Sequence, residues 1–146
     1  MIFISAPYSD PDCRIKEQRA EATAKTCAIL MNKGFLVCCP LLQGLAVIEK
    51  SGMHLPDDYD YWQHFCNDFV RACSEMWVLT INGYHTSKGV EGEVMAAHEL
   101  GIPVNLFSVD LDHGMICDHG PVLQDDNANL HWPDASEKVW SPWATR

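Results

Sequence analysis

The stretch "EMWVLTINGYHTSKGVEGEVMAAHELGIPVNLFSV", residues 75–109, decides the fold class of this chain. Apolar runs at 75–81 and 102–109 predict two buried strands. Between them, the loop "NGYHTSKG" leads into a helical pattern at 90–100, which Gly101 ends. Two strands joined by a helix pair in parallel through a right-handed crossover. The stretch therefore predicts one βαβ unit.

The same alternation extends toward the N-terminus. Residues 2–5 predict a strand, and a helix follows with Ser9 or Asp10 as its cap and Pro11 in its first turn. "FLVCCP" predicts the second strand, and 59–73 predict another helix. Residues 41–58 predict a short helix and a flap. This order predicts an α/β fold, a flavodoxin-like or Rossmann-like three-layer sandwich with a mostly parallel sheet of four to five strands.

The composition changes near residue 109. Residues 1–108 carry the α/β alternation, whereas 109–146 are rich in Asp, His, Gly and Pro and include Trp132, Trp140 and Trp143. We interpret 1–108 as the domain. We expect 109–146 to form a C-terminal extension with a short strand or hairpin, packed on that domain or on a neighbouring subunit.

Charge and cysteine content restrict the partners. The chain has 146 residues and a formal net charge of -10, which argues against a nucleic-acid polymer or an anionic membrane as partner. Seven cysteines without CxxC spacing indicate a reduced protein with neither a disulfide framework nor a metal site. With no signal peptide or spanning segment, we expect a cytoplasmic location.

A crevice is expected where the strand order reverses. With the order 2-1-3-4, that point lies between the first and third strands, next to "SAPYSD" and "NGYHTSKG". Ser87, Gly89 and Gly92 lie near a helix start, where exposed N–H groups suit an anion. The alternative is a plain loop with a capping serine. Neither a Walker motif nor GxGxxG is present, so an ATP or NAD site has little support.

Four side chains near this crevice indicate acid–base or nucleophilic chemistry. Glu91 and Glu93 lie near the positive end of a helix dipole, which favours their ionised forms and suits a nucleophile or base. Asp68 is one position away from an aromatic helical stripe, and Tyr8 follows the first strand. Each has an ordinary alternative, as a surface acid or a packed tyrosine. Two carboxylates and a phenol beside an anion site favour glycosyl chemistry.

Three motifs together resemble the nucleoside 2-deoxyribosyltransferase superfamily over residues 1–108. They are "IFISAPYSD", the Asn67–Asp68 pair, and S-x-G-x-x-x-E from Ser87 to Glu93. Within that superfamily the chain resembles uncharacterised small bacterial and phage members, and it is similar to deoxynucleoside monophosphate N-glycosidases. The resemblance implies a flavodoxin-like fold and a homo-oligomer. It also implies cleavage or transfer at the N-glycosidic bond of a 2-deoxynucleoside or its 5-monophosphate.

The resemblance also implies a role for each matched residue, without a metal or organic cofactor. Glu93 matches the nucleophile that attacks the anomeric carbon, Asp68 the aspartate that handles the base or the sugar, and Tyr8 the tyrosine that positions the glutamate. Ser87 is typical of members that contact a phosphate, and Arg14 is a second candidate for phosphate binding. Three further residues complete the expected substrate-binding set: Ser5, Pro7 and Gly89.

Two alternatives to this enzyme stay open at the level of sequence. One is a non-catalytic module of the same fold that binds a nucleotide or nucleotide-sugar. The other is a phosphate-ester hydrolase, which the absence of an acid cluster at the strand ends weakens. The residues leave open the base, the sugar, and the choice between hydrolysis and transfer.

Overall fold

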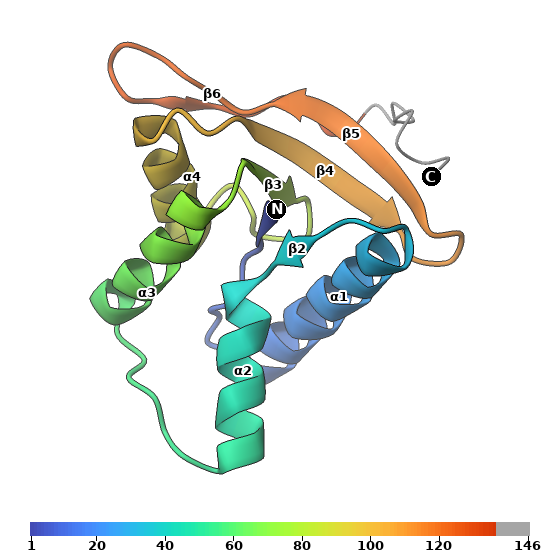
Figure 1. The fold of residues 1–146 in the computed structure, drawn as a ribbon, viewed down its shortest axis with the longest axis vertical. Helices are drawn as coiled ribbons and strands as arrows, with labels where there is room; N and C mark the ends of the chain where they lie inside the picture. Colours follow the sequence, from blue (N-terminus) through green and yellow to red (C-terminus); the bar gives the residue numbers. More distant parts are fainter. Residues whose placement is uncertain (137–146) are drawn as a thin grey trace.

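A five-stranded sheet forms the centre of the molecule (Figure 1). The computed structural model describes residues 1–136. The strands lie in the order β2-β1-β3-β4-β5, in which β5 alone runs antiparallel. Their bounds are β1 Ile2–Ser5, β2 Val37–Cys38, β3 Glu75–Leu79, β4 Val104–Asp110 and β5 Met115–Pro121. The predicted 2-1-3-4 order and the mostly parallel sheet are confirmed.

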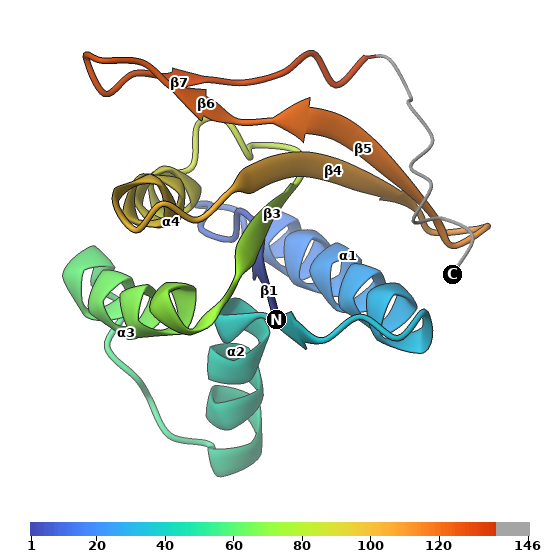
Figure 2. The same ribbon diagram turned by 45° about the horizontal axis from the view of Figure 1, so that its top comes forward.

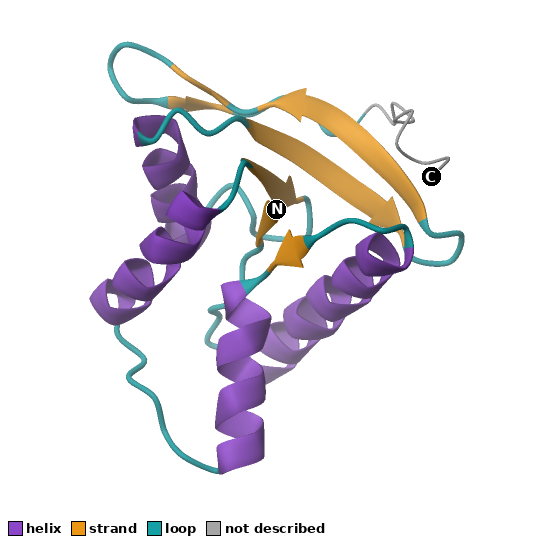
Figure 3. Ribbon diagram, in the orientation of Figure 1, coloured by secondary structure: helices purple, strands orange, loops and turns teal. Residues whose placement is uncertain are grey.

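Four helices lie between the parallel strands of residues 1–136 (Figure 3). They are α1 Cys13–Asn32, α2 Pro40–Ser51, α3 Tyr59–Ala72 and α4 Lys88–Glu99. Helix α1 follows β1, α2 and α3 together follow β2, and α4 follows β3. Side chains on a strand point to alternate faces, so Ile2 and Ile4 join one apolar core with Leu30 of α1, while Phe3 joins another with Val70 of α3 and further side chains of α4. The predicted three-layer α/β sandwich is therefore present.

The first helix begins slightly later than its sequence pattern predicts. Neither Ser9 nor Asp10 is its cap; Asp12 takes that position, and its carboxylate accepts a hydrogen bond from the Arg14 N–H at 2.9 Å. Pro11 then lies outside the helix. Several polar residues of this region can cap a helix, and the sequence pattern alone does not separate them.

The segment after β2 forms a full helix. Pro40 occupies the first turn of α2, where a missing N–H costs nothing. Gly52 ends α2 in the left-handed conformation, with φ of 66°. An exposed loop then leads to α3, whose cap Asp58 accepts from the Tyr61 N–H at 2.8 Å. The predicted short helix is α2, and the predicted flap corresponds to this loop.

The sheet continues past the predicted domain boundary, which falls inside β4. A hairpin joins β4 to β5, and a second small hairpin follows from β6 Leu123–Gln124 and β7 Leu130–His131 (Figure 2). The Trp132 ring lies 5.5 Å from the Tyr84 ring of the same chain. Trp140 and Trp143 lie outside the described residues.

Candidate functional site

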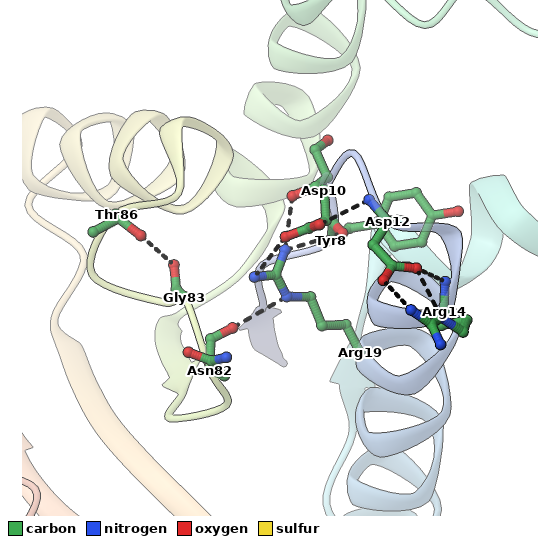
Figure 4. A network of polar contacts seen from close by, with 9 residues as sticks. Tyr8, Asp10, Asp12, Arg14, Arg19, Asn82, Gly83 and Thr86 are labelled. Carbon is green, nitrogen blue, oxygen red and sulfur yellow. Dashed lines mark hydrogen bonds and ion pairs between the residues drawn. The ribbon is translucent and has the colours of Figure 1, made fainter.

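Two loops meet at the carboxyl ends of β1 and β3, and Arg19 of α1 joins them (Figure 4). Its guanidinium donates to the Asn82 carbonyl at 3.1 Å, the Ser9 carbonyl at 2.7 Å and the Tyr8 carbonyl at 3.3 Å. It also lies 3.6 Å from the Asp10 carboxylate, and only 11% of its side chain is exposed. A buried cation needs such partners. Arg19 therefore fixes the two loops relative to each other.

Gly83 makes room for this guanidinium. A Cβ atom at Gly83 would lie 2.5 Å from Arg19 Nη2, and the backbone φ of +93° is one that other residues rarely adopt. The loop that leads from β3 to α4 is therefore shaped around Arg19.

The helix after this loop carries the candidate acid. Ser87 caps α4, and its Oγ accepts a hydrogen bond from the Val90 N–H at 3.3 Å. Gly89 and Glu93 are four residues apart, so they share one face of α4. Both line the same pocket.

Glu93 is held by hydrogen bonds from two other elements. The Ser5 hydroxyl, fully buried at the end of β1, donates to Glu93 Oε2 at 2.5 Å. The Cys66 thiol of α3 forms a second hydrogen bond to the same carboxyl group. These contacts connect a strand and two helices through one side chain.

Burial raises the pKa of Glu93 to about 7, and the hydrogen bonds from Ser5 and Cys66 oppose that rise. The sequence-based expectation that the helix dipole favours ionised Glu93 needs correction. Glu93 is the sixth residue of α4, and the dipole effect fades beyond the first turn. Removal from water is then the dominant influence.

Glu93 lines a small pocket between α3 and α4. The pocket is lined by four residues of α3 and two of α4: Tyr59, Trp62, Gln63, Cys66, Gly89 and Glu93. Its cavity volume is about 50 Å³. Ligand sites commonly have roughly 300–1,000 Å³. The pocket can therefore accept only a small group or one edge of a larger ligand.

Two glycines allow α3 to pack closely around the pocket. A Cβ at Gly92 would lie 2.4 Å from the Tyr59 hydroxyl and 2.5 Å from Gln63 Nε2. A Cβ at Gly44 would lie 2.7 Å from the Trp62 ring. Glycine in a helix interior usually costs stability. Here it permits the approach of the pocket side chains.

Four predicted site residues lie around this pocket and the start of α4. Gly89 and Glu93 line the pocket, Ser5 donates to the Glu93 carboxyl group, and Ser87 caps α4 six residues before Glu93. The position of Ser5 differs from the expected substrate contact, because its hydroxyl is buried and donates to Glu93. Ser5 thus makes the contact with Glu93 that the resemblance implied for Tyr8.

The other predicted residues lie elsewhere. Asp68 is 84% exposed and pairs with Arg71 at 3.5 Å. It follows Cys66 by two positions, about 200° around the helix, and so points away from Glu93. Arg14 is 87% exposed and pairs with Asp12 at 2.9 Å.

Tyr8 and Pro7 belong to the loop that follows β1. The Tyr8 ring lies beside Lys16, with Nζ 5.8 Å from its centroid. Within the described residues its hydroxyl makes no hydrogen bond, and Ser5 holds Glu93 instead. Pro7 is buried, and Glu91 is exposed on α4.

Sequence reasoning missed the contribution of α3. Tyr59, Trp62, Gln63 and Cys66 follow the spacing i, i+3, i+4 and i+7, which places them on one helix face. That spacing is equally typical of an ordinary apolar stripe. A more specific signal was Gly92, a glycine inside a helix, which indicates close approach by a neighbour.

Residues 1–136 contain neither a cluster of metal ligands nor a membrane-spanning helix. No group of three or more His, Cys, Asp and Glu side chains in that range could hold a metal ion. None of the helices there is both long enough and apolar enough to cross a membrane. All seven cysteines are free thiols.

Residues 1–109 match a protein family described as Domain of unknown function (DUF1937), and the chain belongs to that family. The matched segment ends one residue before β4 ends, and it contains every pocket residue named above. A search of curated proteins found no match.

Proposed function

We propose that this protein cleaves or transfers the N-glycosidic bond of a 2-deoxynucleoside 5-monophosphate or a deoxynucleoside, with Glu93 as nucleophile. The observation that carries the proposal is a carboxyl group at the base of a pocket, held by Ser5 at 2.5 Å and by Cys66. Hydrogen bonds from two fixed donors restrict the orientation of the carboxylate, which is what a positioned nucleophile requires.

The chemical steps follow from the nature of the bond. The Glu93 carboxylate attacks the anomeric carbon, the carbon–nitrogen bond breaks, and its electron pair leaves with the base. The product is a deoxyribosyl ester of Glu93. Water or a second base then attacks the same carbon and releases the carboxylate. Only the ionised form of Glu93 can begin the cycle, so its pKa near 7 matters for the rate.

The start of α4 is the proposed position for the phosphate. Ser87 and Gly89 lie at the positive end of the helix dipole, four to six residues before Glu93. The Ser87 oxygen already accepts from Val90. Its hydroxyl hydrogen is free to donate to a phosphate oxygen.

Base release tests this proposal. The wild-type chain is incubated with each of the common deoxynucleoside monophosphates and deoxynucleosides, and the free bases are separated chromatographically. Glu93→Gln is the test variant, and Glu91→Gln on the exposed face of α4 is the matched control. We expect release by wild type and by Glu91→Gln only. Turnover by Glu93→Gln would rule out Glu93 as the nucleophile.

A second candidate function is a nucleotide-binding module without turnover. One observation favours it: Glu93 is the only carboxylate among the residues that line the described pocket, and Asp68 lies on the surface. This candidate predicts saturable binding of a nucleotide, measured by calorimetry, with no free base after long incubation.

We further propose a homo-oligomer that acts in the cytoplasm. Seven free thiols are typical of a reducing compartment. Val47 and Met53, on α2 and the loop after it, expose 47% and 68% of their surface. Such apolar side chains suit a contact between subunits. Light scattering at micromolar concentration tests the assembly, and a monomer there would contradict it.

A further inference from the structure

Tyr59 is a phenol that lines the pocket and has no role in the steps proposed for Glu93. It is the first residue of α3, and it lines the pocket together with Glu93. Its hydroxyl lies close to α4, because Gly92 directly faces it. The sequence predicted a phenol at this site but assigned it to Tyr8.

The hydrogen bonds of Tyr59 leave its proton available. The Gln63 side chain favours the negatively charged form of the phenol, as expected of an amide N–H that faces its oxygen. The Tyr59 hydroxyl itself donates to the Lys88 carbonyl at 3.4 Å. A typical O–H···O hydrogen bond measures roughly 2.7–2.8 Å. A ligand atom in the pocket can therefore replace this weak partner.

The surroundings of Tyr59 also keep it protonated. Burial raises its pKa, and the Glu91 and Glu93 carboxylates raise it further, against the effect of Gln63. The hydroxyl is therefore a neutral donor throughout the physiological pH range. A neutral donor suits an atom that gains electron density as a bond breaks.

We propose that Tyr59 is a catalytic residue, whose hydroxyl donates a hydrogen bond to the departing base. This inference rests on the proposed function. As Glu93 attacks the anomeric carbon, the electron pair of the carbon–nitrogen bond moves onto the base. Tyr59 stabilises that charge without losing its own proton, and water supplies the proton that the free base carries away. Tyr59 thus takes the task that the resemblance implied for Asp68.

A leaving-group experiment tests the role of Tyr59. Tyr59→Phe removes one oxygen and keeps the ring. Tyr61→Phe is the matched control, because Tyr61 lies two residues further along α3 and does not line the pocket. Each variant is assayed with an accepted deoxynucleotide and with its analogue whose base carries an electron-withdrawing halogen. The halogenated base leaves more easily and needs less help from a donor.

We expect Tyr59→Phe to lower kcat/KM about tenfold to a hundredfold with the natural base, as for one hydrogen bond to a charged group. The loss should be clearly smaller with the halogenated base. Tyr61→Phe should stay within about twofold of wild type for both, the size of effect expected far from reacting atoms. If Tyr59 only held α3 against α4, Tyr59→Phe would lower kcat/KM equally for both substrates.

Equal losses, or no loss, would overturn the role of Tyr59 while leaving the glycosidase intact. Failure of wild type to release any base is a different result: it would reject the proposed function, and the Tyr59 role with it. Thermal melting of both variants confirms that each still folds.

Discussion

At the scale of a single residue, two opposing effects set the pKa of Glu93. Burial favours its protonated form, whereas the donors Ser5 and Cys66 favour the carboxylate. The balance leaves the pKa near 7, within the range where an enzyme can use both forms. The sequence pointed to Glu93 by its place near a helix start. It did not reveal the two donors, because Ser5 and Cys66 are distant in the chain and meet only after the sheet has formed.

The first prediction concerns stability and pH. The pKa of Glu93 rises from 4.5 to about 7 on folding, so the folded state binds the proton more tightly. The associated stability is fully present below pH 4.5 and is lost as the pH rises toward 7. The loss corresponds to roughly 3 kcal/mol. Glu93→Gln does not titrate at this position, so the free energy of unfolding of the variant, relative to that of wild type, should increase by this amount between pH 4 and 8.

Urea unfolding at several pH values measures that difference. Glu91→Gln removes the same charge from the exposed face of α4 and serves as control. Its difference from wild type should change little with pH. A pH-independent difference for Glu93→Gln as well would show that Glu93 is not desolvated by folding.

The second prediction concerns Ser5. Ser5→Ala removes one donor from the Glu93 carboxylate, so the pKa of Glu93 should rise further above 7. The pH at which half of the carboxyl groups are ionised, followed by carbon NMR of labelled glutamate, should therefore increase. Ser108→Ala, whose hydroxyl contacts His119 instead, is the control. An unchanged midpoint in Ser5→Ala would mean that the hydrogen bond does not form in solution.

At the scale of elements, the order of strands and helices was readable from the sequence, whereas the pocket was not. Apolar runs and capping residues predicted the βαβ units, and crossover handedness then restricted their arrangement. The contribution of α3 depended on how closely two helices approach, which Gly44 and Gly92 permit. The sequence was also insufficient to place Asp68. Asp68 lies on the solvent-exposed face of α3, although it is only two positions after Cys66, which lines the pocket.

The third prediction tests that close approach. Gly92→Ala would place a Cβ 2.4 Å from the Tyr59 hydroxyl and 2.5 Å from Gln63 Nε2. Relief of this overlap should lower the free energy of unfolding by about 1–3 kcal/mol. Gly89→Ala is a matched control in the same helix, because its Cβ would meet only Ser87 Oγ at 3.7 Å. It should stabilise the chain by about 0.4–1 kcal/mol. Thermal melting measures Tm for each variant. A lower Tm for Gly89→Ala as well as for Gly92→Ala would contradict this explanation.

At the scale of the whole molecule, the sheet extends beyond the family segment. Residues 1–109 contain the pocket, yet β5 covers the outer edge of β4 through pairs that run from Asn105 to Asp110. Ile116, Cys117 and Val122 from this later part are buried. The change in composition near residue 109 suggested a separate extension, because a hairpin to an edge strand has a weaker sequence signal than a βαβ unit.

The last prediction asks whether residues 1–110 fold without this edge. A chain ending at Asp110 would expose the hydrogen-bonding groups of β4 and the apolar surface that Ile116 and Val122 cover. An open, apolar edge strand promotes association between chains. We expect such a chain to aggregate and to lack a cooperative melting transition. Ile116→Ala in the full chain, a milder change, should cost about 2–5 kcal/mol and keep the transition. If the short chain instead melted cooperatively near the wild-type temperature, the family segment would be a complete folding unit, and β5 would be an addition to a finished sheet.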